Sequence, residues 1–343
     1  MRTAFGQRFD LAPGYLNTAS IGIPPAPAAD AVAAAVGDWR SGRGRAAAFD
    51  EPVAAARAAF ARLVGFPQDR VAIGGSVSEL VGLIAASVPP GSRVLVPEGE
   101  FTSVTWPFAM AADRGVTLTS VPLAELPAHV ARADLVAASV AQSADGTLVD
   151  LPALRGEAAR AGTRVVLDAT QALGWLPLSL GWADAVIAAG YKWLLCPRGA
   201  AWLAITEEFG ATITPHSANW YAARDRWAST YSLPPDLAGT ARCLDTSPAW
   251  HSHVGAAVSL PWLASLDGQA VRAHCVGLAN LLRAGLGQSP SNSAITVVDQ
   301  PDAARKLTAG EVVASTRQSK ARLAFHLYNT ESDVELALRA LRG

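Results

Sequence analysis

Two charged side chains follow short apolar segments in the middle of the 343-residue chain. Asp168 comes directly after Arg164–Leu167, and Lys192 lies 24 residues further on, after Ala185–Ala188. If both segments are strands of one parallel sheet, both side chains lie at its carboxyl edge, where such sheets bind ligands. Burial among aromatic and apolar neighbours would lower the pKa of Lys192 and favour its neutral, nucleophilic amine. This pattern is typical of a lysine that forms a Schiff base with a carbonyl compound.

Pyridoxal 5′-phosphate (PLP) is a carbonyl cofactor that gives both residues a role. Lys192 would hold its aldehyde as a Schiff base, and Asp168 would keep the pyridine nitrogen protonated, so that the ring withdraws electrons. Gln171 could donate a hydrogen bond to the ring hydroxyl. The segment GGSVSEL at 74–80 offers a glycine turn, hydroxyl groups and a helix N-terminus, all of which suit a phosphate. We therefore predict a PLP site built from these segments.

Each of these features also has a structural explanation when it is taken singly. An aspartate at a strand end can cap the next helix or pair with an arginine. A lysine between Tyr191 and Trp193 can be a surface residue that lies over aromatic rings. A glycine turn before a helix is common in any α/β protein. The order of the features along one chain is what favours the PLP site.

The order of the motifs resembles the class V aminotransferase group of fold-type I PLP enzymes. That group includes cysteine desulfurases, kynureninase, isopenicillin epimerase-like proteins and the ergothioneine-pathway C–S lyase. The resemblance covers nearly the whole chain and rests on four segments: YLNTASIG (15–22), VVLDATQALG (165–174), GYKWLLCPRG (190–199) and RLAFHLYNTESDV (322–334). The two middle segments are the most specific.

The expected fold is α/β. Short apolar segments alternate with helical patterns between about residues 50 and 235, which indicates βαβ units and a mostly parallel sheet. The resemblance implies the fold-type I architecture, in which a smaller α+β domain follows a large domain with the central sheet. We expect residues 1–20 to form an N-terminal segment near the active site, 21–240 the large PLP-binding domain, and 241–343 the small C-terminal domain.

The expected secondary structure follows from the spacing of apolar residues and from turn signals. Helices are expected at Ala28–Val36, Pro52–Val64, Glu79–Val88, Ser103–Asp113, Leu151–Arg160, Trp262–Leu286 and Ser332–Leu341. Strands are expected at Arg93–Pro97, Val116–Val121, Leu135–Val140, Arg164–Leu167, Ala185–Ala188, Ala200–Ile205, Ala294–Val298, Val312–Ser315 and Arg322–Phe325.

The resemblance implies four contacts to the cofactor phosphate. Ser76 and Val77 fall where the group binds it through backbone amides and a hydroxyl. The hydroxyl of Tyr191 would reach it, as in kynureninase. Ser247, in DTSPAW, resembles the residue that reaches the phosphate of the neighbouring subunit. That last contact implies a homodimer with shared active sites.

The resemblance also implies which residues face the ring. Phe101 would stack on it, although packing in the core is the alternative explanation for this side chain. Gln142 falls where an amide lies near the ring hydroxyl, and Asp168 and Gln171 contact the ring. Lys192 would shuttle the Cα proton as general acid and base.

Two arginines compete for the substrate carboxylate, which the planar guanidinium fork suits. Arg322 matches the kynureninase-like position and is favoured, whereas Arg317 lies near where desulfurases and transaminases place theirs. Trp220 lies in a segment expected at the substrate mouth, where it could form part of an aromatic wall or simply pack.

The chain departs from the group's pattern near the lysine. Ala189 and Tyr191 stand where many members carry serine and histidine, and Phe101 replaces a histidine that often lies on the ring. A phenylalanine can stack but cannot relay protons, so Lys192 would do that work. Leu307–Ala321 contains no cysteine, which excludes an ordinary cysteine desulfurase.

These features predict an enzyme that transforms an amino acid, with transamination as the default. A PLP-dependent lyase or epimerase remains open, because fold and cofactor do not decide the outcome at Cα. A non-catalytic PLP-fold protein is disfavoured, since the resemblance extends from about residue 15 to residue 340 and no DNA-binding appendage is seen.

Composition excludes several other classes of protein. The formal net charge is −1 with scattered basic residues, so neither nucleic acid nor a membrane surface is an expected partner. No uncharged apolar stretch reaches the roughly 18 residues that span a bilayer, and no signal peptide is recognised. Three widely spaced cysteines favour a cytoplasmic protein without disulfides. His251 and His253 lack a third ligand at sensible spacing, so no metal site is expected.

Overall fold

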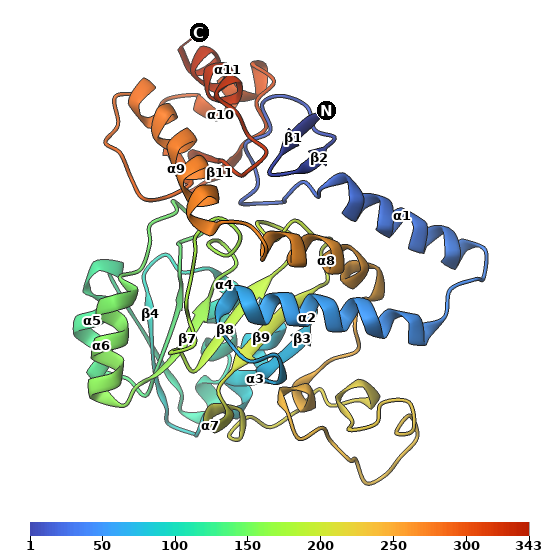
Figure 1. Ribbon diagram of the computed structural model, residues 1–343. Coiled ribbons are helices and arrows are strands. Elements are labelled where there is room, and N and C mark those ends of the chain that lie inside the picture. The colour runs from blue at the N-terminus through green and yellow to red at the C-terminus, as the bar shows by residue number, and fades with distance from the viewer. Residues whose placement is uncertain (343) are drawn as a thin grey trace.

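Seven strands form the central sheet of the computed structural model, which describes residues 1–342 (Figure 1). The strands lie in the order β3-β9-β8-β7-β6-β4-β5. β9 runs antiparallel to both of its neighbours, and the other neighbouring pairs are parallel. Their bounds are β3 Val71–Gly74, β4 Arg93–Pro97, β5 Thr117–Val121, β6 Leu135–Ser139, β7 Arg164–Asp168, β8 Ala185–Ala189 and β9 Ala201–Ile205. The expected mostly parallel sheet is confirmed.

Helices cover both faces of this sheet because its central strands are apolar on both sides. Along β8, Val186 and Ala188 belong to one core, and Ile187 belongs to the core on the opposite face. The first face is covered by α2 (Asp50–Val64), α5 (Leu126–His129), α6 (Leu151–Ala161) and α8 (Trp250–Leu263). The second is covered by α3 (Val77–Ser87) and α4 (Thr102–Ala109). The long helix α1 (Ala26–Arg40) packs against α8 outside this layer (Figure 1).

A second, antiparallel sheet lies in the C-terminal part of the chain. Its strand order is β10-β12-β11, with bounds Ile295–Val298, Lys320–Ala324 and Ser315–Arg317. The helices around it are α9 (Gly268–Gly285), α10 (Ala303–Ala309) and α11 (Glu331–Arg342). The first residues of the chain form a hairpin, β1 (Arg2–Ala4) and β2 (Gln7–Phe9), beside this group in Figure 1. An α+β assembly therefore follows the large sheet, as the sequence indicates.

The structure corrects three predicted elements. The single helix expected at Trp262–Leu286 is wrong, because α8 ends at Leu263 and α9 begins anew after Asp267. The Asp267 carboxylate accepts hydrogen bonds from the backbone N–H of Gln269 and Ala270, so it caps the new helix. The helix expected at Ser103–Asp113 already ends at Ala109 and is followed by a short 3-10 turn.

The third correction concerns the strand expected at Val312–Ser315. The strand β11 starts only at Ser315, because Val313 pairs with the N-terminal segment instead. The N–H of Leu16 donates to the carbonyl of Val313 at 2.9 Å, and the N–H of Val313 donates to that of Gly14 at 2.9 Å. The N-terminal segment is thereby joined to the small sheet.

Within residues 1–342, no helix is both long and apolar enough to cross a bilayer. The same residues hold no cluster of three or more histidine, cysteine or acidic side chains that could bind a metal. The three cysteines are free thiols.

Candidate active site

The candidate site lies at the carboxyl edge of the central sheet. Asp168 is the last residue of β7, and Lys192 follows β8 by three residues. Ser139, at the end of β6, is the register partner of Asp168, and Glu100 and Phe101 follow β4. Because these four strands are parallel, one edge of the sheet collects all of these side chains.

Lys192 is buried, with only 7% of the residue's surface exposed. Burial lowers its pKa to about 8, the charge of Asp168 opposes that change, and the charges of Arg322, Arg317 and Arg198 add to it. Its Nζ lies 5.3 Å from the centre of the Phe101 ring and 5.5 Å from that of Tyr191. A considerable fraction of the amine is therefore neutral near pH 8, as a nucleophile requires.

Asp168 is buried as deeply as Lys192. Burial raises the pKa of its carboxyl, while a hydrogen bond from the Thr170 N–H at 2.8 Å and the charge of Lys192 act in the opposite sense. The Thr170 hydroxyl accepts a hydrogen bond from the Ala189 N–H at 3.0 Å. The turn after β7 is thus joined to β8 just before the lysine.

The two glutamines expected at the ring hydroxyl differ in their hydrogen bonding. Gln171 uses its amide within the protein: Nε2 donates to the Ala19 carbonyl and the Ser143 hydroxyl, and Oε1 accepts from the Trp193 indole at 2.8 Å. Gln142 has a buried Nε2 with no hydrogen-bond partner among the described residues. A buried donor of this kind is rare without a ligand or water.

The expected phosphate turn connects β3 with α3. The Ser76 hydroxyl accepts a hydrogen bond from the Glu79 N–H at 3.2 Å and so caps α3. The Glu79 carboxylate accepts one from the Gly75 N–H at 2.7 Å. Val77 is the first helical residue, so the N-terminus of α3 is turned toward the same sheet edge.

Arg322 and Arg317 lie together in the small sheet and share one hydroxyl. Arg322, on β12, is 1% exposed and donates to the hydroxyls of Ser20 at 2.9 Å and Ser315 at 3.1 Å, and to the Ser143 carbonyl. Arg317, on β11, reaches the same Ser20 hydroxyl at 3.4 Å. In residues 1–342, neither guanidinium has a carboxylate within ion-pair distance. Burial and the charge of Arg317 lower the pKa of Arg322 to about 10.

The N-terminal segment contacts both the arginines and the lysine loop. The Gly22 N–H donates to the Tyr191 carbonyl at 2.8 Å. A Cβ at Gly22 would lie 1.8 Å from the Lys192 carbonyl oxygen, so only glycine fits there. Ser20, two residues earlier, contacts Arg322 and Arg317. Sequence reasoning noticed this segment but not these contacts, which depend on long-range packing.

Glu100 is a second acid that sequence reasoning missed. Its carboxylate accepts three hydrogen bonds of 2.6 Å, from the N–H and hydroxyl of Ser139 and from the Phe101 N–H. Burial raises its pKa, and the charge of Asp168 adds to the rise. It lies three residues after the buried strand β4, in PEGEF, and an acid shortly after a buried strand is similar to the signal that identified Asp168.

Ser247 and Trp220 lie together in a different part of the chain. The Trp220 indole donates to the Ser247 hydroxyl at 3.1 Å. The Trp220 ring packs against those of Tyr221 and Trp227 at 5.2 and 4.9 Å. Their expected roles, at a partner's phosphate and at the substrate mouth, stay predictions.

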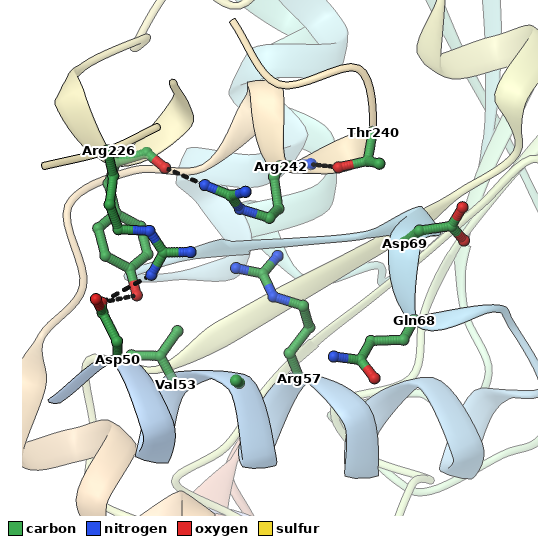
Figure 2. Close-up of a pocket in the computed structure, with 10 residues that line it drawn as sticks. Asp50, Val53, Arg57, Gln68, Asp69, Arg226, Thr240 and Arg242 are labelled. Atoms are coloured by element: carbon green, nitrogen blue, oxygen red, sulfur yellow. Dashed lines mark hydrogen bonds and ion pairs between the residues drawn. The ribbon is translucent and has the colours of Figure 1, made fainter. Parts of the chain in front are cut away.

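A cavity of about 480 Å³ lies near these two residues and is lined by three arginines (Figure 2). We call it the arginine cavity, after Arg57, Arg226 and Arg242. Arg57 forms an ion pair with Asp245 at 2.7 Å, and Arg226 forms one with Asp50 at 2.7 Å. Arg242 donates to two backbone carbonyls. Lys192 does not line this cavity, so it is separate from the candidate active site.

The residues at the sheet edge fit PLP. A buried amine, a buried carboxylate and an unpartnered amide donor lie around Phe101, which is an aromatic ring with 40% of its surface exposed. The amine suits an aldehyde, the carboxylate a pyridinium nitrogen, and the exposed ring a stacked heterocycle. The fold and this set of groups define a PLP-dependent enzyme of fold type I.

Comparison with protein families identifies the group more closely. Residues 32–309 match the family described as aminotransferase class-V. That match covers more than half of the chain, and the protein therefore belongs to the class V aminotransferase family. Its cofactor is pyridoxal 5′-phosphate.

Two relatives show how varied the family is. The chain is 26% identical to the uncharacterized aminotransferase YcbU of Bacillus subtilis over 82% of its own length and 81% of the relative. It is 30% identical to isopenicillin N epimerase of Streptomyces clavuligerus, over 72% of its own length and 67% of the relative.

Solved structures share the fold at lower identity. A cysteine desulfurase from Thermococcus onnurineus NA1 superposes with a TM-score of 0.84 at 19% identity, covering 96% of this chain and 94% of the other. The cystine C–S lyase C-DES superposes with a TM-score of 0.83 at 21% identity, covering 96% of this chain and 97% of the other. These likenesses establish the architecture and not the reaction.

Proposed function

We propose that the protein is an aminotransferase that holds PLP as a Schiff base on Lys192. The observation that carries the proposal is the buried amine of Lys192, which lies beside a buried aspartate at the carboxyl edge of the sheet. The chain has two other lysines, Lys306 and Lys320. Lys306 donates to the Leu341 carbonyl, and Lys320 pairs with Asp299 at 2.7 Å. Lys192 alone of the three is both buried and placed at a strand end.

When bound, PLP supplies an electron-withdrawing ring that stabilises negative charge at the substrate Cα. Asp168 holds a proton at the pyridine nitrogen, and Phe101 orients the ring from one face. Gln142 donates its free N–H toward the ring hydroxyl. The amine of Lys192, whose pKa is about 8, removes and returns the Cα proton as general base and acid.

Arg322 and Arg317, which lie together in the small sheet, support an amino-acid substrate. Arg322 donates to four neutral acceptors on Ser20, Ser143 and Ser315 and to no acid, so its buried charge is uncompensated until a carboxylate binds. Arg317 donates to the same Ser20 hydroxyl, so two positively charged guanidinium groups lie side by side. The charges of Arg322 and Arg317 act on the Lys192 amine, so a substrate α-carboxylate bound by them would lie near that amine.

Cysteine chemistry does not support a desulfurase. Cys196 and Cys275 are fully buried, and burial raises the pKa of each thiol far above neutrality. Burial also raises the pKa of Cys243, the remaining thiol. A nucleophilic cysteine needs the opposite shift.

Epimerisation is the second candidate, and the 30% identical relative named isopenicillin N epimerase favours it. Both reactions begin with removal of the Cα proton by Lys192. They differ in where that proton is returned. An epimerase would return it to the opposite face of Cα, whereas a transaminase would not return it to Cα.

Ser247 further supports a homodimer. Its hydroxyl is exposed at the end of a segment fixed to β3, where it could reach the phosphate of a second copy. We propose a dimer with shared sites, and a monomer by sedimentation would contradict it. We also propose a cytoplasmic location, which the three free thiols favour.

The decisive experiment mixes the holoenzyme with single amino acids in deuterium oxide. Transamination converts the bound cofactor to its pyridoxamine form and releases a keto acid. Epimerisation leaves PLP unchanged and yields the other enantiomer with deuterium at Cα. Recovery of a cleaved side chain with PLP unchanged would identify a lyase and overturn the proposal.

Borohydride reduction tests the covalent assignment separately. It should fix the cofactor to the peptide that contains Lys192 and abolish the visible absorbance. Lys192→Ala should prevent this labelling, whereas Lys306→Ala and Lys320→Ala should leave it intact. Label on either of the other lysines would contradict the assignment.

A further inference from the structure

Arg198 is an arginine without a partner beside the expected phosphate turn. Its guanidinium carbon lies 5.0 Å from the centre of the Tyr191 ring, and the Lys192 Nζ lies 5.5 Å from the same ring. The residue is exposed. Across residues 1–342 its guanidinium forms no ion pair and donates no hydrogen bond. An exposed cation held over an aromatic ring is available to a ligand.

The backbone fixes Arg198 next to Gly75 and Ser76. β3 and β9 pair with Gly74 opposite Ala201, so the residues that follow β3 and those that precede β9 lie side by side. A Cβ at Gly75 would lie 4.0 Å from the carbonyl oxygen of Gly199. The hydroxyl of Ser252 donates to the Arg198 carbonyl at 2.7 Å and holds this segment in place.

The electrostatics of the turn favour a cation. The phosphate of PLP carries close to two negative charges at neutral pH. The expected contacts, Ser76, Val77 and Tyr191, are all neutral. The Glu79 carboxylate on the Gly75 N–H adds another negative charge at the same turn. The partial positive charge of the α3 N-terminus, about half a unit, does not balance these.

The residues before Lys192 supply no further contact to the phosphate, which strengthens the case for a cation. Ala189 has no hydroxyl to offer, so β8 contributes no side-chain donor at its end. Arg198 brings a planar fork of donors to the same edge from the other side of Tyr191. Its charge already acts at this edge, since it contributes to the lowered pKa of Lys192.

We propose that Arg198 binds the phosphate of PLP and replaces the missing serine hydroxyl as a charged contact. This role depends on the cofactor and not on which reaction the enzyme catalyses. It places the strongest anion contact of the cofactor on the loop that also carries Lys192.

Comparing two ligands tests the proposal without measuring turnover. PLP and pyridoxal differ only in the phosphate, so their dissociation constants separate the phosphate contact from the ring contacts. Apoprotein is titrated with each ligand, and tryptophan fluorescence reports binding. Arg198→Gln should weaken PLP binding by about tenfold or more and change pyridoxal binding by less than about twofold.

Two further variants complete the experiment. Arg198→Lys keeps the charge and should retain most of the PLP affinity. Arg155→Gln, which removes another exposed arginine on α6, should leave both ligands unaffected. The ³¹P resonance of bound PLP should shift in Arg198→Gln and not in Arg155→Gln. Equal losses for PLP and pyridoxal, or unchanged PLP affinity in Arg198→Gln, would overturn the proposal.

Discussion

Two groups of three arginines behave differently in this protein. In the arginine cavity, Arg57 and Arg226 each pair with an aspartate at 2.7 Å, and Arg242 donates to backbone carbonyls (Figure 2). Around Lys192, the second group (Arg198, Arg317 and Arg322) has no acidic partner within residues 1–342. Paired guanidinium groups connect distant segments of the chain, whereas unpaired ones near Lys192 leave their charge for a ligand.

The arginine cavity illustrates the structural use of such pairs. Asp245 accepts hydrogen bonds from Arg57 and from the Ile73 N–H of β3, and burial raises the pKa of its carboxyl despite the arginine. Burial also works to raise the pKa of Asp50, but hydrogen bonds from Trp227, Arg226 and Tyr221 together lower it. The hydrogen bonds and ion pairs around the cavity thus hold residues 220–247 against α2 and β3.

The largest effect is expected from breaking a buried pair in the arginine cavity. Asp245→Asn leaves the buried charge of Arg57 uncompensated and should lower the free energy of unfolding by about 3–5 kcal/mol. Urea denaturation of the holoenzyme measures the change. Asp236→Asn breaks the exposed Arg224–Asp236 pair and should change stability little. If both variants were equally stable, the cavity would have no structural role.

Arg322→Gln should show the opposite behaviour. Because this arginine has only neutral partners, its removal should lower kcat/KM for the amino acid by about a hundredfold while stability changes less than in Asp245→Asn. Steady-state kinetics and urea denaturation of the same preparation give both numbers. A variant that unfolds readily but keeps its kcat/KM would place Arg322 with the structural group.

Arg317→Gln should have a smaller effect on the same quantity. Arg317 is only partly buried and reaches Ser20 at 3.4 Å, so a fall in kcat/KM of about tenfold is expected. If Arg317→Gln proves more damaging than Arg322→Gln, the assignment of the carboxylate to Arg322 is wrong.

The unpaired arginines also predict a pH dependence. Because the pKa of Lys192 is lowered to about 8, the neutral amine increases as the pH rises through 8. The rate at which apoprotein captures PLP should therefore rise between pH 7 and 9 and then level off. Arg322→Gln removes a positive charge, so the midpoint should move upward. A midpoint that does not move would show that the charge of Arg322 does not contribute to this pKa.

The sequence predicted the parts of the site that depend on strand ends. Asp168 and Lys192 each follow a buried apolar segment, and parallel strands bring such positions to one edge, whereas Phe101 was expected from the family resemblance alone. The hydrogen-bond partners of Gln171 could not be predicted, because its amide is used by Ala19 and Trp193 from distant parts of the chain. Periodicity and residue type carry no information about such contacts.

Some predicted boundaries of helices and strands were wrong for a related reason. The apolar pattern of Trp262–Leu286 continues through the break between α8 and α9, and only Asp267 marks the new start. Val313 looks like part of a strand of the small sheet, yet it pairs with Tyr15 through hydrogen bonds to Gly14 and Leu16. In both cases the local sequence pattern favoured one structure, and a contact that forms only in the folded chain produced another.

The short stretch from Ser20 to Gly22 connects the arginines of the small sheet with the loop that carries Lys192. Ser20 holds the arginines of the small sheet, and Gly22 lies against the carbonyl of Lys192 with no room for a side chain. If Arg322 and Arg317 bind the substrate carboxylate as proposed, the spacing between that carboxylate and the Lys192 amine depends on these two residues of backbone. An insertion or deletion there would change which substrate length the enzyme accepts before any residue around the cofactor changed.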